Sequence, residues 1–378
     1  MKKTLLAAAV VSALVASTAA SAANVYDKDG TTLNVNGRIE AQWYNAGSSN
    51  NYTGKTANND SSIYNWARMG LEGRSKINDY ATAFGYMEFD VGDGDQNASQ
   101  FKARDQYIGV DFGKFGAVKT GRYKNIVSTV VTATDVLGGD GESGKAFVVG
   151  DSRNAGKLTY TWTGYGVLLG AEYQSAKDGY EEHGVVYNVE KGYSVIAGYT
   201  SPVVLFGPIS IKAGYSYMDG QDDFSIKTED GVTHEVKFVR TDVDNQSGYA
   251  ASLAWGVPSQ GLYLATEYSH NTTEYIGAKD DLKQTGVEFA AKYSFENGLS
   301  LATGYQYESY DDGKQDVKSS QIPVVAEYNF NPNFKVYAQA NFGVSDTEKD
   351  NGEINHEHGI NPTYGDGNTF AVGARYTF

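Results

Sequence analysis

The alternation of apolar and polar residues at every second position is the feature that most constrains this chain. From Leu33 to Trp43, apolar or small residues take the odd positions and polar or charged residues take the even ones. A period of two residues is typical of a β-strand with one apolar and one polar face. The pattern returns at residues 67–74, 287–295 and 334–342, and no segment after residue 23 keeps a helical period. The sequence therefore predicts an all-β protein.

The connections between these strands are alternately short and long. The short ones carry turn residues: Asn78-Asp79, Gly113 to Gly116, Thr163-Gly164, Glu296 to Gly298 and Asn331 to Asn333. The long ones are polar and rich in Asp, Asn and Gly: residues 45–62, 92–101, 125–152, 219–246, 271–282, 310–318 and 345–367. A barrel that crosses a membrane has tight turns on one side and long loops on the other, whereas a soluble sandwich has no need of this alternation.

The polarity of the strand faces also favours a membrane barrel. Charged residues such as Arg38, Glu40, Arg68 and Glu72 lie in the middle of strands, and the opposite faces contain many Ala and Gly residues that are too small to fill a wide interior. Turned outward, small and large apolar residues contact lipid equally well, and the charged faces line water. A closed sheet also pairs every backbone polar group, as hydrocarbon requires. The mean hydropathy of -0.44 fits, because only alternate strand residues need to be apolar.

The number of strands is left open by two alternatives. Seventeen candidate strands can be placed, but a closed antiparallel barrel of this kind needs an even number. Either Glu190-Lys191-Gly192 is a turn and residues 202–246 form one long loop, or residues 182–201 form a single long strand. Both alternatives give sixteen strands. The apolar residues from Val185 to Tyr199 lie at odd-numbered positions throughout, so the pattern does not decide between the two alternatives.

The first 22 residues have the three parts of a secretory signal peptide. Met1-Lys2-Lys3 is a basic start, Leu5 to Val15 is an apolar run, and Ala20-Ser21-Ala22 is a small-x-small cleavage pattern. We expect residues 1–22 to be removed and residues 23–378 to form the barrel. Removal of two lysines leaves 29 basic residues against 46 acidic ones, a formal charge of -17.

Several classes of function are disfavoured by the composition. With no cysteine, the chain has no disulfide scaffold and no thiolate metal site. Its acidic balance argues against nucleic acid as a partner. Asp90, Asp93 and Asp95 lack the spacing of a calcium loop, so a solvated loop is the expected structure there. No nucleophile elbow or paired Ser/His placement is found. We expect no enzymatic activity, no metal and no cofactor.

The residues resemble the general porins of the Gram-negative outer membrane over essentially the whole chain. The resemblance rests on the combination of five segments: Ala23 to Gly30 with the strand that follows, Ala67 to Gly73, Gly121-Arg122-Tyr123, Thr134 to Leu137, and Ala371 to Phe378. It implies a transmembrane antiparallel barrel of sixteen strands, a homotrimer, and a third long loop folded into the lumen. It also implies that the C-terminal strand, with Tyr376 and the terminal Phe378, is the assembly signal.

The resemblance further implies a pore constriction, in which arginines of the wall face acids of the third loop. Carried over by position, the wall residues are Arg38, Arg68, Arg104 and Arg153, and the best-matched loop acid is Asp135. The Pro-Glu-Phe-Gly-Gly run of the family reads Gly138 to Glu142 here, and no residue matches its glutamate. Asp140 and Glu142 are chosen by charge and proximity.

The function that follows is a water-filled channel for the passive diffusion of small hydrophilic solutes and ions. The acidic loops predict a preference for cations. The alternatives are a porin selective for sugars or oligosaccharides, which stacked aromatic residues along the lumen would mark, and a barrel enzyme of the outer membrane. The expected partners are outer-membrane lipid and lipopolysaccharide, the barrel-assembly machinery during insertion, and two further copies of the chain.

Overall fold

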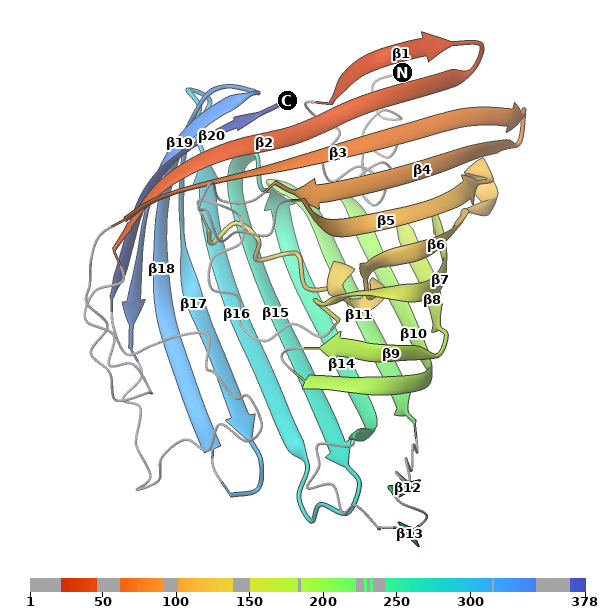
Figure 1. Ribbon diagram of the computed structural model, residues 1–378. Helices are drawn as coiled ribbons and strands as arrows, with labels where there is room; N and C mark the ends of the chain where they lie inside the picture. The colour runs from red at the N-terminus through yellow and green to blue at the C-terminus, as the bar shows by residue number, and fades with distance from the viewer. Residues whose placement is uncertain are drawn as a thin grey trace.

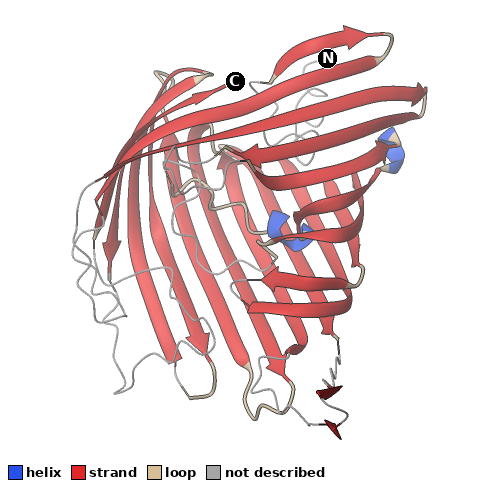
Figure 2. Ribbon diagram, in the orientation of Figure 1, coloured by secondary structure: helices blue, strands red, loops and turns tan. Residues whose placement is uncertain are grey.

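The chain folds into one continuous antiparallel sheet that closes on itself as a barrel (Figure 1). The computed structural model describes residues 22–45, 62–91, 101–138, 150–182, 185–221, 228–229, 232–233, 243–314, 316–344 and 368–378. Residues 1–21 of the expected signal peptide, and Asp140 and Glu142 of the expected constriction, lie outside these ranges. The described chain is mostly strand (Figure 2) and has two short 3₁₀-helices.

The strands of the first half of the barrel are β1 (Ala23–Lys28), β2 (Thr31–Asn45), β3 (Ser62–Asn78), β4 (Ala81–Asp90), β5 (Lys102–Asp111), β6 (Ala117–Lys124), β7 (Arg153–Gly164), β8 (Val167–Gln174), β9 (Lys177–Glu182) and β10 (Val185–Val204). Those of the second half are β11 (Gly207–Gly220), β14 (Val243–Val257), β15 (Gln260–Tyr275), β16 (Leu282–Ser294), β17 (Leu299–Asp311), β18 (Asp316–Asn331), β19 (Phe334–Gly343) and β20 (Thr369–Thr377). The two-residue strands β12 (Thr228–Glu229) and β13 (Val232–Thr233) pair only with each other. The 3₁₀-helices are η1 (Gly113–Phe115) and η2 (Ile126–Thr129).

The eighteen strands of the main sheet occupy sixteen positions around the barrel. Strands β1 and β20 share one position, because both pair with β2 along different parts of its length. Strands β8 and β9 share another position in the same way, beside β10. The pairing of β2 with β20 closes the sheet. The predicted sixteen-stranded barrel is confirmed.

Strand β10 decides between the two alternatives for the strand count. It runs from Val185 to Val204 without a turn, so the single long strand is correct. Its pairing with β11 shifts register between Val189 and Lys191, which is a β-bulge. A bulge inserts one residue and reverses which face the following side chains take. Val189 is therefore buried inside the barrel, whereas Tyr193, which has the same sequence parity, is 51% exposed on the outside.

The two faces of the sheet have opposite polarity. Outward residues such as Ile39, Ile108 and Phe289 are more than half exposed, as expected of side chains that contact lipid. Inward residues such as Glu40 and Glu288 are buried among other side chains of the lumen. Among the described residues, no helix has the length and the apolar character needed to cross a membrane.

Tight turns lie at one end of the barrel, together with both termini of the described barrel (Figure 1). Asp29-Gly30 and Tyr165-Gly166 have φ values of 54°, 75°, 55° and 82° in chain order. Two consecutive residues with positive φ are the mark of a type I′ turn, whose twist matches that of the flanking strands. The turn between β7 and β8 thus falls two residues after the predicted Thr163-Gly164, which still belongs to β7.

Candidate functional site

The third long loop enters the barrel instead of projecting from it. Asn125 fixes its start, because its side-chain Oδ1 accepts from the backbone N–H of Val127 at 2.9 Å and caps η2. The same side chain donates through Nδ2 to Ser194 Oγ at 2.8 Å and to Ser216 Oγ at 3.2 Å. Since Ser194 and Ser216 lie on β10 and β11, one asparagine ties the loop to two strands of the wall.

Apolar packing then holds the first part of the loop against this wall. Ile126, Val127 and Val130 are buried in one cluster with Leu168 and Ile196 of β8 and β10. Burial of each such side chain contributes about 1.5–3 kcal/mol. Inward-facing glycines make the room: a Cβ at Gly170 would collide with Ile126 and Ile196, and one at Gly214 would crowd Val130. Small residues of the wall thus accept the large residues of the loop.

Hydrogen bonds to β15 and β16, further along the same side of the wall, hold the second part of the loop. Thr134 donates from its backbone N–H to Glu267 Oε2 at 3.4 Å, and its hydroxyl donates to Glu288 Oε2. Tyr263 Oη donates to the carbonyl oxygen of Ala133 at 2.8 Å. Leu137 packs beside these bonds against Tyr263 and other residues of β15 and β16. The loop is therefore fastened at both parts, and the prediction that it folds into the lumen is confirmed.

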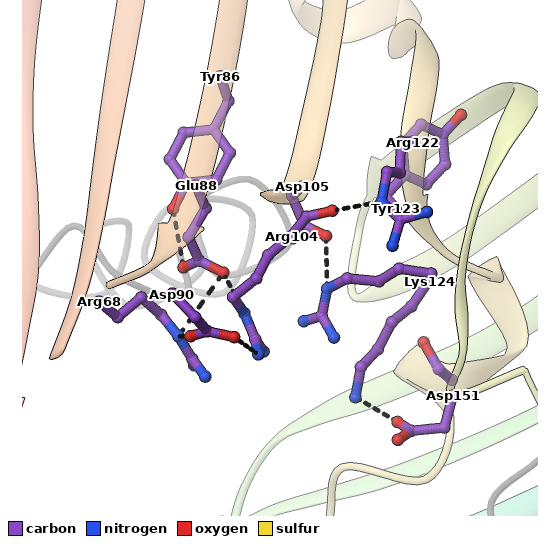
Figure 3. A network of polar contacts seen from close by, with 12 residues as sticks. Arg68, Tyr86, Glu88, Asp90, Arg104, Asp105, Arg122, Tyr123, Lys124 and Asp151 are labelled. Carbon is purple, nitrogen blue, oxygen red and sulfur yellow. Dashed lines mark hydrogen bonds and ion pairs between the residues drawn. The ribbon is translucent and has the colours of Figure 1, made fainter. Parts of the chain in front are cut away.

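An arginine cluster lies on another part of the wall, on β3 to β5. Arg68 on β3 donates from Nε to Asp90 Oδ1 at 2.9 Å. Arg104 on β5 donates from Nε to Glu88 Oε2 and from Nη1 to Asp90 Oδ2, both at 2.8 Å. The two acids lie on β4, between the two arginines (Figure 3). Each positive charge of this cluster is therefore held by a carboxylate of the wall itself.

The same arrangement continues toward the start of the third loop. Arg153 on β7 donates from Nε to Asp105 Oδ1 at 2.7 Å, and Lys124 on β6 pairs with Asp151. Arg122 donates to the carbonyl oxygen of Arg104 at 3.1 Å. Figure 3 shows Asp105, Arg122, Lys124 and Asp151 beside the cluster of Arg68 and Arg104. Strands β5 to β7 thus extend the ion-paired wall.

Arg38 is also part of this wall. It stands on β2 directly opposite Arg68 in the register of the two strands. Arg38 and Arg68 lie on the paired strands β2 and β3, and Arg104 and Arg153 follow on β5 and β7, so the structure places all four predicted arginines on one side of the barrel.

Asp135 lies on the other side of the lumen. It is an exposed residue of the third loop, between the fastened residues Thr134 and Leu137. Its charge acts on Lys212 of β11. Strand β15, which holds this part of the loop, is half-way around the sixteen positions from β4. Asp135 therefore faces the arginine wall across the open part of the lumen.

Glu88, Asp90 and Asp105 are site residues that the sequence analysis did not identify. Glu88 and Asp90 both lie at the alternate positions of β4 whose side chains face the lumen, and this spacing could have identified them. Asp90 was instead expected to be part of a solvated loop, and this expectation is wrong, because Asp90 ends β4 and binds two arginines.

The C-terminal residue closes the barrel. The backbone N–H of Phe378 donates to the carbonyl oxygen of Gly37 at 2.9 Å, and that of Gly37 donates to the carbonyl oxygen of Phe378 at 2.8 Å. A Cβ on Gly37 would strike the ring of Phe378. Tyr376 is 49% exposed on the outer face, 6.4 Å from that ring. The last strand thus carries two aromatic side chains to the seam of the sheet.

Comparison with known proteins finds a matching family model and similar proteins that cover most of the chain. A family model described as Gram-negative porin matches residues 7–343. The outer membrane porin protein OmpD of Citrobacter koseri is 28% identical over 90% of this chain and 92% of its own length. The putative outer membrane porin protein NmpC of Escherichia coli is 27% identical over 92% of this chain and 93% of its own length.

Solved structures with the same fold cover nearly the whole chain. The OmpF protein of Salmonella typhi, solved in complex with daunomycin, has a TM-score of 0.70 and 20% identity, and covers 94% of this chain and 100% of its own. The anion-selective porin of Comamonas acidovorans has a TM-score of 0.62 and 17% identity, with 92% and 100% covered.

Proposed function

The chain belongs to the Gram-negative porin family and is an outer-membrane porin, and we propose that it forms a water-filled channel for the passive diffusion of small hydrophilic solutes and ions. The observation that carries this proposal is the third loop, whose described residues 125–138 pack against one side of the lumen, while the ion-paired arginine wall lies on the other. A gap between such surfaces excludes solutes by size and acts on their charges.

The constriction in this proposal lies between the arginine wall and the third loop. Arg38, Arg68, Arg104 and Arg153 line the wall side, and Asp135, with Asp140 and Glu142 outside the described residues, forms the loop side. Glu88, Asp90 and Asp105 offset three of the four arginines, so the wall side keeps one positive charge, which the three acids of the loop side exceed. Together with the charge of -17 on the mature chain, this favours cations over anions.

A planar-bilayer recording with purified protein tests the channel and its selectivity. We expect stepwise increases in conductance and a reversal potential on the cation-selective side in a tenfold KCl gradient. Protein that inserts into the bilayer but never conducts overturns the proposed function. A reversal potential on the anion side overturns only the cation preference.

A sugar-selective channel is the second candidate, and a group of inward aromatic side chains favours it. The Tyr107 ring lies 6.2 Å from that of Phe84, 5.4 Å from that of Tyr86 and 5.7 Å from that of Tyr123. Phe84 and Tyr123 are themselves buried, whereas Tyr86 and Tyr107 are partly exposed. Liposome swelling with a series of sugars distinguishes the two functions, since only a selective channel saturates.

We propose in addition that the protein is a homotrimer in contact with lipid and lipopolysaccharide, and that residues 1–22 are its signal peptide. Small outward residues such as Gly37, Ala41 and Ala67 let neighbouring barrels approach closely, as small residues do within membranes. The solved OmpT porin of Vibrio cholerae, which has a TM-score of 0.65 and 18% identity, is described in a trimer form. Unboiled electrophoresis should show a trimer band, and monomer mass by light scattering in detergent would contradict it.

A further inference from the structure

Five charged side chains lie together on the inner wall between β16 and β2, apart from the site described above. Lys292 Nζ is 2.9 Å from Glu327 Oε2, and Lys335 Nζ is 2.6 Å from Glu327 Oε1. Arg375 Nε is 2.6 Å from Glu40 Oε2. These side chains are at most 19% exposed. We call the five residues the inner-mouth cluster.

The cluster reaches the end of the barrel that carries the short turns. Lys292 lies two residues before the end of β16, and Lys335 is the second residue of β19. Arg375 is three residues from the C-terminus. In a transmembrane barrel of this class the short turns are periplasmic. A solute that has passed the third loop therefore meets these side chains on its way out.

The charges of the cluster are not arranged for stability alone. Lys335 and Arg375 stand directly opposite each other on β19 and β20. Like charges in that position destabilise a sheet, by a few tenths of a kcal/mol or more. The three cations are accompanied by two carboxylates, so the cluster has one net positive charge. A neutral residue in place of Lys335 or Arg375 would remove the repulsion and leave the other ion pair intact.

We propose that the inner-mouth cluster is a second selectivity element, at which Lys335 and Arg375 contact the anionic groups of solutes, such as carboxylate or phosphate. Glu327 and Glu40 are positioning residues, because their carboxylates hold the two cations against the wall. This inference rests on the proposed function as an open channel. One net charge about 8 Å from a permeating ion in water changes the local concentration of that ion about twofold at low salt.

Two variants of opposite sign test the proposal in planar bilayers. Lys335→Gln removes a positive charge, and because anion and cation are each affected about twofold in opposite directions, the permeability ratio of anion to cation should fall about fourfold in dilute potassium phosphate. Glu327→Gln removes a negative charge of the same ion pair, and the ratio should rise about fourfold. Both changes break the contact between Lys335 and Glu327, so a merely structural role would move the ratio in the same direction for both.

Lys114→Gln is the matched control. It removes the same charge at the same end of the barrel, but from the η1 turn, where Lys114 is exposed. The ratio for this variant should equal that of the wild type. Shifts of Lys335→Gln and Glu327→Gln in one direction, or shifts no larger than that of the control, overturn the inference.

A measurement on the wild-type protein keeps the test independent of the folding of the variants. With channels inserted in one orientation, the anion permeability should be higher when the dilute phosphate solution faces the short turns, because the cluster is then least screened. Equal permeability in both orientations overturns the inference while the channel itself still conducts. Wild-type protein without any conductance overturns the proposed function instead, so the two failures are distinguishable.

Discussion

Replacement of Asp90 by Asn should weaken the cation preference of the channel. The Asp90 carboxylate accepts from Arg68 at 2.9 Å and from Arg104 at 2.8 Å, and Glu88 holds Arg104 through a second bond. The two arginines and two acids have no net charge together. Asp90→Asn keeps the size of the side chain and one carbonyl acceptor, but it leaves this part of the wall with one positive charge.

The size of the effect follows from the position of Asp90 in the lumen. At about 5 Å in water, one unit charge is worth about 0.8 kcal/mol for a passing ion, and screening at physiological salt reduces this to roughly half. Each ion is then affected about twofold, in opposite directions, so the permeability ratio of K⁺ to Cl⁻ should fall about fourfold. The loss of stability should be small, about 1 kcal/mol, because Asp90 is one-third exposed and Glu88 still holds Arg104.

The assay is the reversal potential in a tenfold KCl gradient, recorded for Asp90→Asn and for Asp79→Asn. Asp79 lies on an exposed turn and pairs with Lys76, so its replacement removes the same charge outside the lumen. The control should keep the wild-type value. If Asp90→Asn also keeps it, while the protein remains a heat-modifiable barrel, then Asp90 does not lie beside the path of the ions and the assignment of the wall is wrong.

Three further results are expected. The combined replacement Asp135→Asn, Asp140→Asn and Glu142→Gln should shift the reversal potential toward anions with little loss of folded barrel, and an unchanged potential would show that the third loop does not form the constriction. Deletion of Phe378 should reduce the amount of heat-modifiable barrel in the outer membrane, because the two hydrogen bonds to Gly37 close the sheet there, and normal insertion would contradict this. Thr134→Val should make the open-channel current noisier, since it removes the hydroxyl that donates to Glu288, a bond of about 1.5–3 kcal/mol; a current as quiet as that of the wild type would show that this bond does not hold the loop.

The positions of the lumen charges could be predicted from the sequence, because a strand places alternate residues on one face. Arg38 and Arg68 were recognised as inward residues from the parity of their strands, and the structure places them directly opposite each other. The extent of the barrel and the short turns followed from the same pattern. The odd or even position of a residue predicts on which face of the sheet its side chain lies, and this prediction holds as long as the strand is regular.

Irregular strands and cross-strand partners could not be predicted. The bulge after Val189 reverses the faces of β10. The alternation of apolar residues does not reveal it, because odd-numbered residues are apolar both before the bulge, where they face inward, and after it, where they face outward. The pairing of Asp90 with Arg68 depends on the register between β3 and β4, which one sequence does not define. Asp90 also adjoins a Gly- and Asp-rich segment, so it was grouped with Asp93 and Asp95 of the loop although it is the last residue of β4.

The third loop separates what sets the width of the pore from what sets its selectivity. Its position is fixed by buried contacts that carry no charge, such as Ile126 and Val130 against β8 and β10, and by the bonds of Thr134 to two glutamates. Asp135, between these anchors, is exposed and carries a charge. Substitution of Asp135 should therefore change the reversal potential at constant conductance. Ile126→Ala, which removes packing without any charge, should instead change the conductance and leave the reversal potential near its wild-type value. Equal effects of both substitutions on the two quantities would show that width and selectivity depend on the same contacts.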